Sequence, residues 1–173
     1  MTPELSRPVR IDSLGEGGRT VAVEADAGER AALAARFGLL SLDALSAEAN
    51  LRREGEIVLA TGRVRASVVQ ACAASGAPVP ATIDEPFSLR FVPEGEAGDA
   101  EIELSPEDWD MIDYAGGAVD LGEAVAETLA LSLDPFPRAP DADAVLRAAG
   151  VLSEDEVVTG PFAALRALKD GPK

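Results

Sequence analysis

The sequence predicts a single α+β domain in which a mainly antiparallel β-sheet packs against a few helices. Alternating apolar and polar residues recur in several segments, which is typical of strands with one buried face. Two other segments carry apolar residues three and four positions apart behind an acidic capping residue, the pattern of an amphipathic helix. With 173 residues, 47% of them hydrophobic, the chain is long enough for one domain with its own core.

The N-terminal segment is expected to form a β-hairpin. Val9 and Ile11 alternate with polar neighbours, Val21 and Val23 do the same, and residues 15–18 supply glycines for a turn between them. These glycines do not form a phosphate-binding loop, because no Gly-Lys-Ser/Thr ending follows and no helix is expected directly after them.

A first helix is expected from about 27 to 37. Asp26 is followed three residues later by Glu29, which resembles a capping box, and the apolar residues behind them fall on one helical face. Gly38 can end the helix, because glycine tolerates the left-handed conformation of a helix C-cap.

Two long strands should follow as an antiparallel pair, at 45–52 and 56–71, with a turn at Glu54-Gly55. Within the second strand the apolar residues change from odd to even positions. Because side chains alternate with period two, one inserted residue would keep both sets on the buried face. Gly62 suits such an insertion, so we expect a β-bulge at 61–63.

The next expected strand spans 87–91, where aromatic and apolar residues alternate with polar ones. Residues 93–117 are rich in Glu, Asp and Gly and are expected to form an acidic loop. A second helix should then begin at Asp120, with Glu123 in its first turn, and stop before Pro135.

The chain is expected to divide into a core domain at 1–140 and a C-terminal tail at 141–173. The tail shows two short helical patterns, at about 141–149 and 161–169, the second with Pro161 at its first position.

The composition excludes several kinds of site. The chain has no histidine and one cysteine. A Ser-His-Asp triad, a Cys-His pair and a tetrahedral Cys/His zinc site within one chain are therefore excluded. Cys72 has no Lys, Arg or His beside it in sequence, so it is expected to be a small packed residue. No secretory signal or membrane span is visible, and we expect a cytoplasmic protein without a cofactor.

The net charge is −16, so the average surface repels phosphate and should attract a basic partner. Between Asp84 and Asp134 there are fifteen carboxylates and one base, Arg90. The candidate partner-binding residues within this segment are Glu107, Asp108, Asp110 and Asp113.

Two other functions stay open. The first is direct RNA binding by arginines on the two paired strands, which are Arg52, Arg53, Arg63 and Arg65. The second is a metal-dependent hydrolase that would use the aspartates at 108–120. A solvated acidic face explains these aspartates as well, and we favour that interpretation.

Several motifs follow one another in a specific order. They are Gly62-x-Val-x-Ala66-x-Val-x-Gln70-x-Cys72, Glu85-Pro-Phe-Ser-Leu-Arg-Phe91, a helix with Asp120-Leu-Gly-Glu123, Asp134-Pro-Phe-Pro-Arg138, and Gly160-Pro-Phe-Ala-Ala-Leu-Arg-Ala-Leu-Lys169. The ordered set resembles the YceD family, large ribosomal RNA subunit accumulation proteins, in its α-proteobacterial form. The family-motif residues are Gln70, Cys72, Asp120, Leu121, Gly122, Glu123, Glu127, Leu131, Pro135 and Pro137.

The resemblance implies a factor for the synthesis, processing or stability of large-subunit ribosomal RNA, without an enzyme active site. An acidic protein would act on RNA most easily through a basic intermediary. We therefore expect contact with a basic ribosomal protein or assembly factor, an indirect link to ribosomal RNA, and neither a membrane nor a small-molecule substrate as partner.

Overall fold

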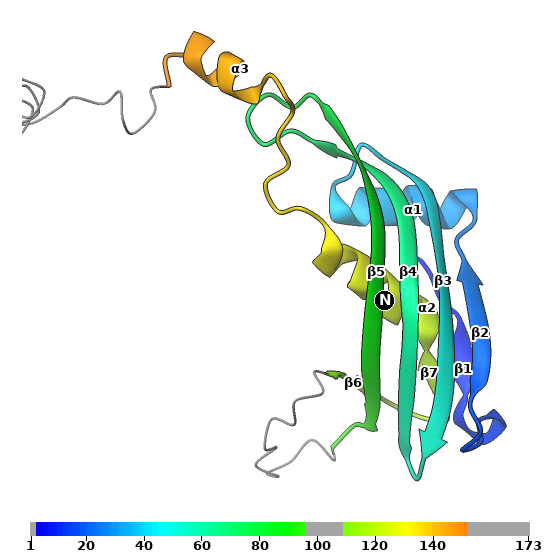
Figure 1. Ribbon diagram of the computed structural model, residues 1–173. Coiled ribbons are helices and arrows are strands. Elements are labelled where there is room, and N and C mark those ends of the chain that lie inside the picture. Colours follow the sequence, from blue (N-terminus) through cyan, green and yellow to red (C-terminus); the bar gives the residue numbers. More distant parts are fainter. Residues whose placement is uncertain (1–2, 96–108, 152–173) are drawn as a thin grey trace, which may run out of the picture.

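The computed structural model describes residues 3–95 and 109–151, and these form an α+β fold (Figure 1). A five-stranded sheet has the order β2-β3-β4-β5-β6, and a separate two-stranded sheet pairs β1 with β7. The strands are β1 (Pro8–Arg10), β2 (Arg19–Glu24), β3 (Ser41–Glu54), β4 (Ile57–Ala71), β5 (Pro78–Pro93), β6 (Asp110–Tyr114) and β7 (Ala118–Asp120). The helices are the 3₁₀ turn η1 (Ile11–Ser13), α1 (Ala27–Phe37), α2 (Leu121–Ser132) and α3 (Ala142–Ala148).

One face of the large sheet carries the core. Figure 1 shows α1 and α2 on the same side of the sheet, where α1 contacts β3 and α2 contacts β4 and β5. The alternation predicted for β3 is confirmed, since its buried side chains are Leu45, Ala47, Ala49 and Leu51. In α2 the side chains of Leu121, Val125 and Leu129 are fully buried. Of the described helices, none is long and apolar enough to cross a membrane.

The predicted N-terminal hairpin is wrong. Val9 pairs with Val119 in the small sheet, whereas Val21 pairs with Ala49 of β3. Ile11 begins the 3₁₀ turn instead of continuing a strand. Alternation correctly located both strands, but period two carries no information on which strand lies alongside which.

The predicted bulge at 61–63 is also wrong. The register of β4 runs without interruption through these residues against both neighbouring strands, and the shift in β3 lies between Leu42 and Ala44. Glycine is required at position 62 for another reason. A Cβ there would lie 2.3 Å from the Glu48 carbonyl oxygen and 2.6 Å from the Phe87 ring, so a larger residue would clash. The parity change is accommodated by placing Leu59 on the opposite face of the sheet, where it is still only 9% exposed.

The acidic loop predicted at 93–117 is wrong in its last part, which contains a strand. Residues 110–114 form β6, which pairs with β5 in parallel and makes the sheet mixed. Ile112 and Tyr114 of this strand pack against the core. A short edge strand in a charged segment has too few apolar residues for a periodic signal, so tertiary pairing decides it.

The predicted helices are largely confirmed. Asp26 and Glu29 form a capping box at the start of α1, and Gly38 ends the helix with a φ of 66°. Asp120 caps α2. In the tail, α3 matches the helix predicted at 141–149, while the one predicted at 161–169 lies outside the described residues.

Candidate functional site

Asp120 joins α2 to the N-terminal segment. Its Oδ1 accepts from the backbone N–H of Gly122 at 2.9 Å and of Glu123 at 3.2 Å, which caps the helix. The same oxygen accepts from the Arg7 N–H at 2.8 Å, and Oδ2 accepts from the Ser6 hydroxyl at 2.6 Å. The carboxylate is therefore occupied by structural contacts.

The next three motif residues have structural roles as well. Leu121 is fully buried. Gly122 lies so close to the N-terminal segment that a Cβ would be 2.7 Å from the Leu5 carbonyl oxygen. Glu123 accepts two hydrogen bonds from the Arg36 guanidinium of α1, at 2.7 and 3.1 Å. The Asp120–Glu123 motif thus holds the two helices and the N-terminal segment together.

A second set of motif residues connects the end of β4 to the segment that follows α2. Its three hydrogen bonds, described next, are called the latch. The Gln70 side-chain amide donates to the Asp134 carbonyl oxygen at 2.8 Å, and the Ala73 N–H donates to the Pro137 carbonyl oxygen at 2.8 Å. The Ala139 N–H donates to the Cys72 Sγ at 3.2 Å. Three contacts thus fasten the segment after α2 to the end of the β4–β5 hairpin.

Cys72 is buried, 3% exposed, as its sequence context predicted. The N–H of Ala139 and the Ser75 hydroxyl lower the pKa of the Cys72 thiol to about 7. Sequence neighbours gave no sign of this, because the principal donor comes from a residue 67 positions away.

Two large apolar side chains near these contacts are exposed, Leu131, which is one of the predicted family-motif residues, and Phe136, which was not among the predicted site residues. Phe136 is 73% exposed and Leu131, at the end of α2, is 83% exposed. Glu127 lies one turn before Leu131 on α2 and is also exposed. Pro135 and Pro137 flank Phe136, and an aromatic residue between two prolines was the signal available in the sequence.

The predicted acidic partner-binding residues are only partly described. Glu107 and Asp108 lie outside the described residues, while Asp110 and Asp113 are exposed on β6. Because they are three positions apart in a strand, these two carboxylates lie on opposite faces. Among the described residues no group of three His, Cys, Asp or Glu side chains could hold a metal ion.

The arginines considered for RNA binding contact acceptors of their own chain. Arg63 and Arg65 both face Asp84, at 2.9 and 3.6 Å. Arg52 lies 3.2 Å from Glu54. The Arg53 Nε donates to the carbonyl oxygen at position 55 at 2.6 Å.

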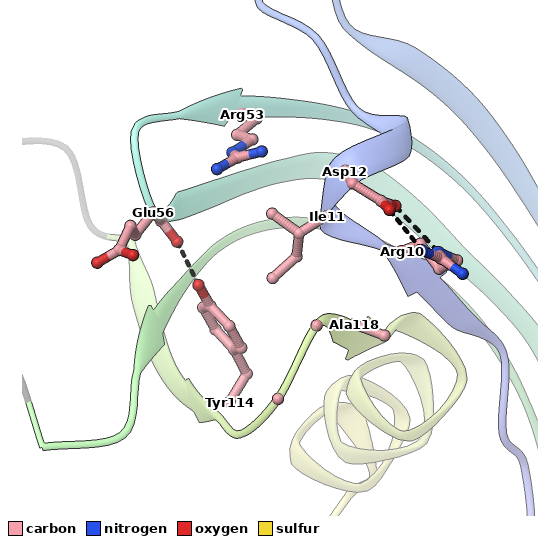
Figure 2. A pocket seen from close by; sticks show the side chains of 9 residues that line it. Arg10, Ile11, Asp12, Arg53, Glu56, Tyr114 and Ala118 are labelled. Atoms are coloured by element: carbon pink, nitrogen blue, oxygen red, sulfur yellow. Dashed lines mark hydrogen bonds and ion pairs between the residues drawn. The ribbon is translucent and has the colours of Figure 1, made fainter.

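An open pocket of about 500 Å³ lies where η1, the β3–β4 turn and the segment before β7 meet (Figure 2). Arg10 and Asp12 pair at its edge, and the Tyr114 hydroxyl donates to the Glu56 carbonyl oxygen at 2.5 Å. Arg53 lies across the pocket from Tyr114 (Figure 2). The lining mixes both signs of charge and much of it is already paired, so it does not select a class of ligand.

One comparison with known proteins identifies a relationship. The family model described as "Large ribosomal RNA subunit accumulation protein YceD" matches residues 60–169. This range includes the latch, α2 and the segment that displays Phe136. Neither a curated protein nor a solved structure matches the chain.

Proposed function

Because this chain belongs to the YceD family and is thereby involved in accumulation of the large ribosomal RNA subunit, we propose that it acts without catalysis, by binding a basic ribosomal protein or assembly factor. The protein would hold or deliver that partner during assembly of the large subunit. Its effect on ribosomal RNA would then be indirect.

The strong acidic charge is the observation that carries this mechanism. A net charge of −16 disfavours extensive contact with phosphate, whereas ribosomal proteins and assembly factors that bind RNA are commonly basic. Complementary charge accelerates encounter with such a partner and disfavours acidic competitors.

The pairing of the arginines supports the same choice over direct RNA binding. Asp84 lies between Arg63 and Arg65 and would have to be displaced or neutralised before both could bind phosphates. Arg52 has Glu54 beside it. Arg52, Arg63 and Arg65 therefore offer little unopposed positive charge to an RNA phosphate.

The first experiment depletes the protein in its native cell and measures mature large-subunit against small-subunit ribosomal RNA. We expect the large-subunit RNA to fall relative to the small-subunit RNA. A tagged chain should then retain a basic ribosomal protein or assembly factor after ribonuclease treatment. Retention of RNA alone, lost steeply with added salt, would instead support direct RNA binding.

A second experiment tests the acidic segment with the partner thus retained. Neutralising Glu107, Asp108, Asp110 and Asp113 to their amides should slow association, and so should raising the salt concentration with the unmodified protein, because charge steering is screened. An association rate indifferent to both changes would leave these residues as a solubilising surface.

A further inference from the structure

The C-terminal end of α2 presents two large apolar side chains to solvent. Leu131 is 83% exposed and Phe136 is 73% exposed, the two highest values among the exposed large hydrophobic residues of the described chain. They are five residues apart, one on the last turn of α2 and one just beyond it. Scattered single apolar residues are ordinary on a protein surface, but an exposed aromatic residue on a restrained backbone is typical of a binding anchor.

The backbone around Phe136 is restrained on both sides of the residue. Its own N–H donates to the Asp134 Oδ1 at 2.9 Å, and proline residues precede and follow it. The carbonyl oxygens of Asp134 and Pro137 are fixed by Gln70 and by the Ala73 N–H. A backbone restrained in this way loses little conformational entropy on binding, which favours affinity.

The charged residues nearest to this pair in sequence are mainly negative. Glu127 is exposed on the same face of α2 as Leu131, and Asp134 is exposed beside Phe136. The nearest base in sequence, Arg138, already contacts Asp143 at 2.6 Å. A partner suited to this surface would place apolar side chains over Leu131 and Phe136 and basic side chains beside Glu127 and Asp134.

We propose that Leu131 and Phe136 are the anchors of a docking surface for a basic protein segment that carries apolar side chains. This inference rests on the proposed function, since it assigns the surface through which a basic partner is bound. It differs from recruitment by the acidic segment, because apolar burial and not charge alone would hold the complex.

The test uses the full chain and a defined probe, a fluorescently labelled helical peptide with Leu at positions i and i+4 and Lys elsewhere. A matched peptide with Ser for Leu keeps the charge. We expect Phe136→Ser and Leu131→Ser each to weaken probe binding about tenfold or more in fluorescence anisotropy. Leu40→Ser, which alters an apolar side chain 55% exposed on the α1–β3 connection, is the control and should have no effect.

Equal binding of the Leu and Ser peptides would overturn the proposal, because charge alone would then account for the affinity. Equal losses in all three variants would also overturn it. If Phe162→Ser or Leu165→Ser strengthened probe binding about tenfold, the occupant would be the chain's own C-terminal segment instead of a partner.

Complementation separates this inference from the proposed function. In depleted cells, Phe136→Ser should fail to restore large-subunit ribosomal RNA, whereas Leu40→Ser should restore it. Full restoration by Phe136→Ser would overturn the docking surface and leave the proposed function standing. A normal RNA ratio after depletion would overturn the proposed function, whatever the peptide measurements gave.

Discussion

The Arg36 guanidinium of α1 donates to both carboxylate oxygens of Glu123 on α2, at 2.7 and 3.1 Å. Arg36 also contacts Glu4 at 2.9 Å, so one side chain joins both helices and the N-terminal segment. Its guanidinium lies 5.3 Å from the centroid of the Phe37 ring. The pKa of Arg36 is raised, chiefly by its hydrogen bonds to Glu123, against the opposing effect of burial.

Arg36→Ala should therefore destabilise the fold by about 1 to 2 kcal/mol, more than an exposed single ion pair, because the pair is bidentate and shared. Chemical denaturation of Arg36→Ala, Glu123→Gln and the double variant measures the coupling. Arg147→Ala, an exposed arginine of α3, is the control. Strictly additive losses at 36 and 123 would contradict the coupling.

Leu129→Ala should cost about 2 to 5 kcal/mol, since Leu129 is fully buried between α2 and the sheet. Leu131→Ala is the matched control two residues further along the same helix, and its exposed side chain should change stability by only about 0.5 kcal/mol or less. Thermal unfolding of both variants checks the prediction. Similar melting temperatures for the two would mean that the buried face of α2 is assigned wrongly.

Gly122→Ala should destabilise the protein by about 1 to 3 kcal/mol, although alanine favours helix, because the added Cβ would meet the backbone of Leu5 and Arg7 at 2.7 and 2.8 Å. At Gly28 in α1 a Cβ would meet only the Asp26 side chain, at 3.3 Å. Gly28→Ala should thus be close to neutral. Urea unfolding that ranks the two variants in the opposite order would refute this account.

Glu29 should make stability depend on acid pH. The Arg7 guanidinium and the Asp26 N–H lower the pKa of Glu29 from its ordinary 4.5 to about 2. Because the folded-state pKa is below the unfolded one, this stabilisation is present above pH 4.5 and is lost as pH falls toward 2. Glu29→Gln keeps an acceptor for the helix cap but lacks the charge.

Melting temperatures of the two proteins across this pH range test the prediction. The advantage of the unmodified protein should be full near pH 7 and shrink below pH 4.5. A difference independent of pH would show that the Glu29 charge contributes nothing.

Gln70→Leu should cost about 1 to 3 kcal/mol, because the Asp134 carbonyl oxygen would lose its donor at a site where Gln70 is only 9% exposed. Loosening the latch should also weaken binding of the Leu-Lys peptide, although Gln70 would not touch it. Peptide affinity and denaturation are measured on the same sample. Unchanged affinity in a destabilised variant would show that the latch does not position Phe136.

The sequence was sufficient for features that depend on near neighbours. Asp26 and Glu29 lie three residues apart and cap α1 with their own side chains, so the start of that helix could be predicted. The same holds for Asp120 at α2, for the paired strands around Glu54-Gly55, and for the buried stripe of β3. Turn chemistry and periodicity act within a few residues, where sequence order and spatial proximity coincide.

Features that depend on distant residues needed the tertiary structure. Val9 finds Val119 as its partner, and Gly62 is required because the Phe87 ring and the β3 backbone lie against it. The motif residues Gln70 and Cys72 could be identified in the sequence, but their contacts with Asp134 and Ala139 could not. The exposure of Phe136 was likewise visible only in the structure. By itself the sequence determined the fold class, the helices α1, α2 and α3 and the acidic charge, because these depend on composition and local spacing. Strand partners, close backbone approaches and the exposure of single apolar side chains depend on contacts that form only when the chain has folded.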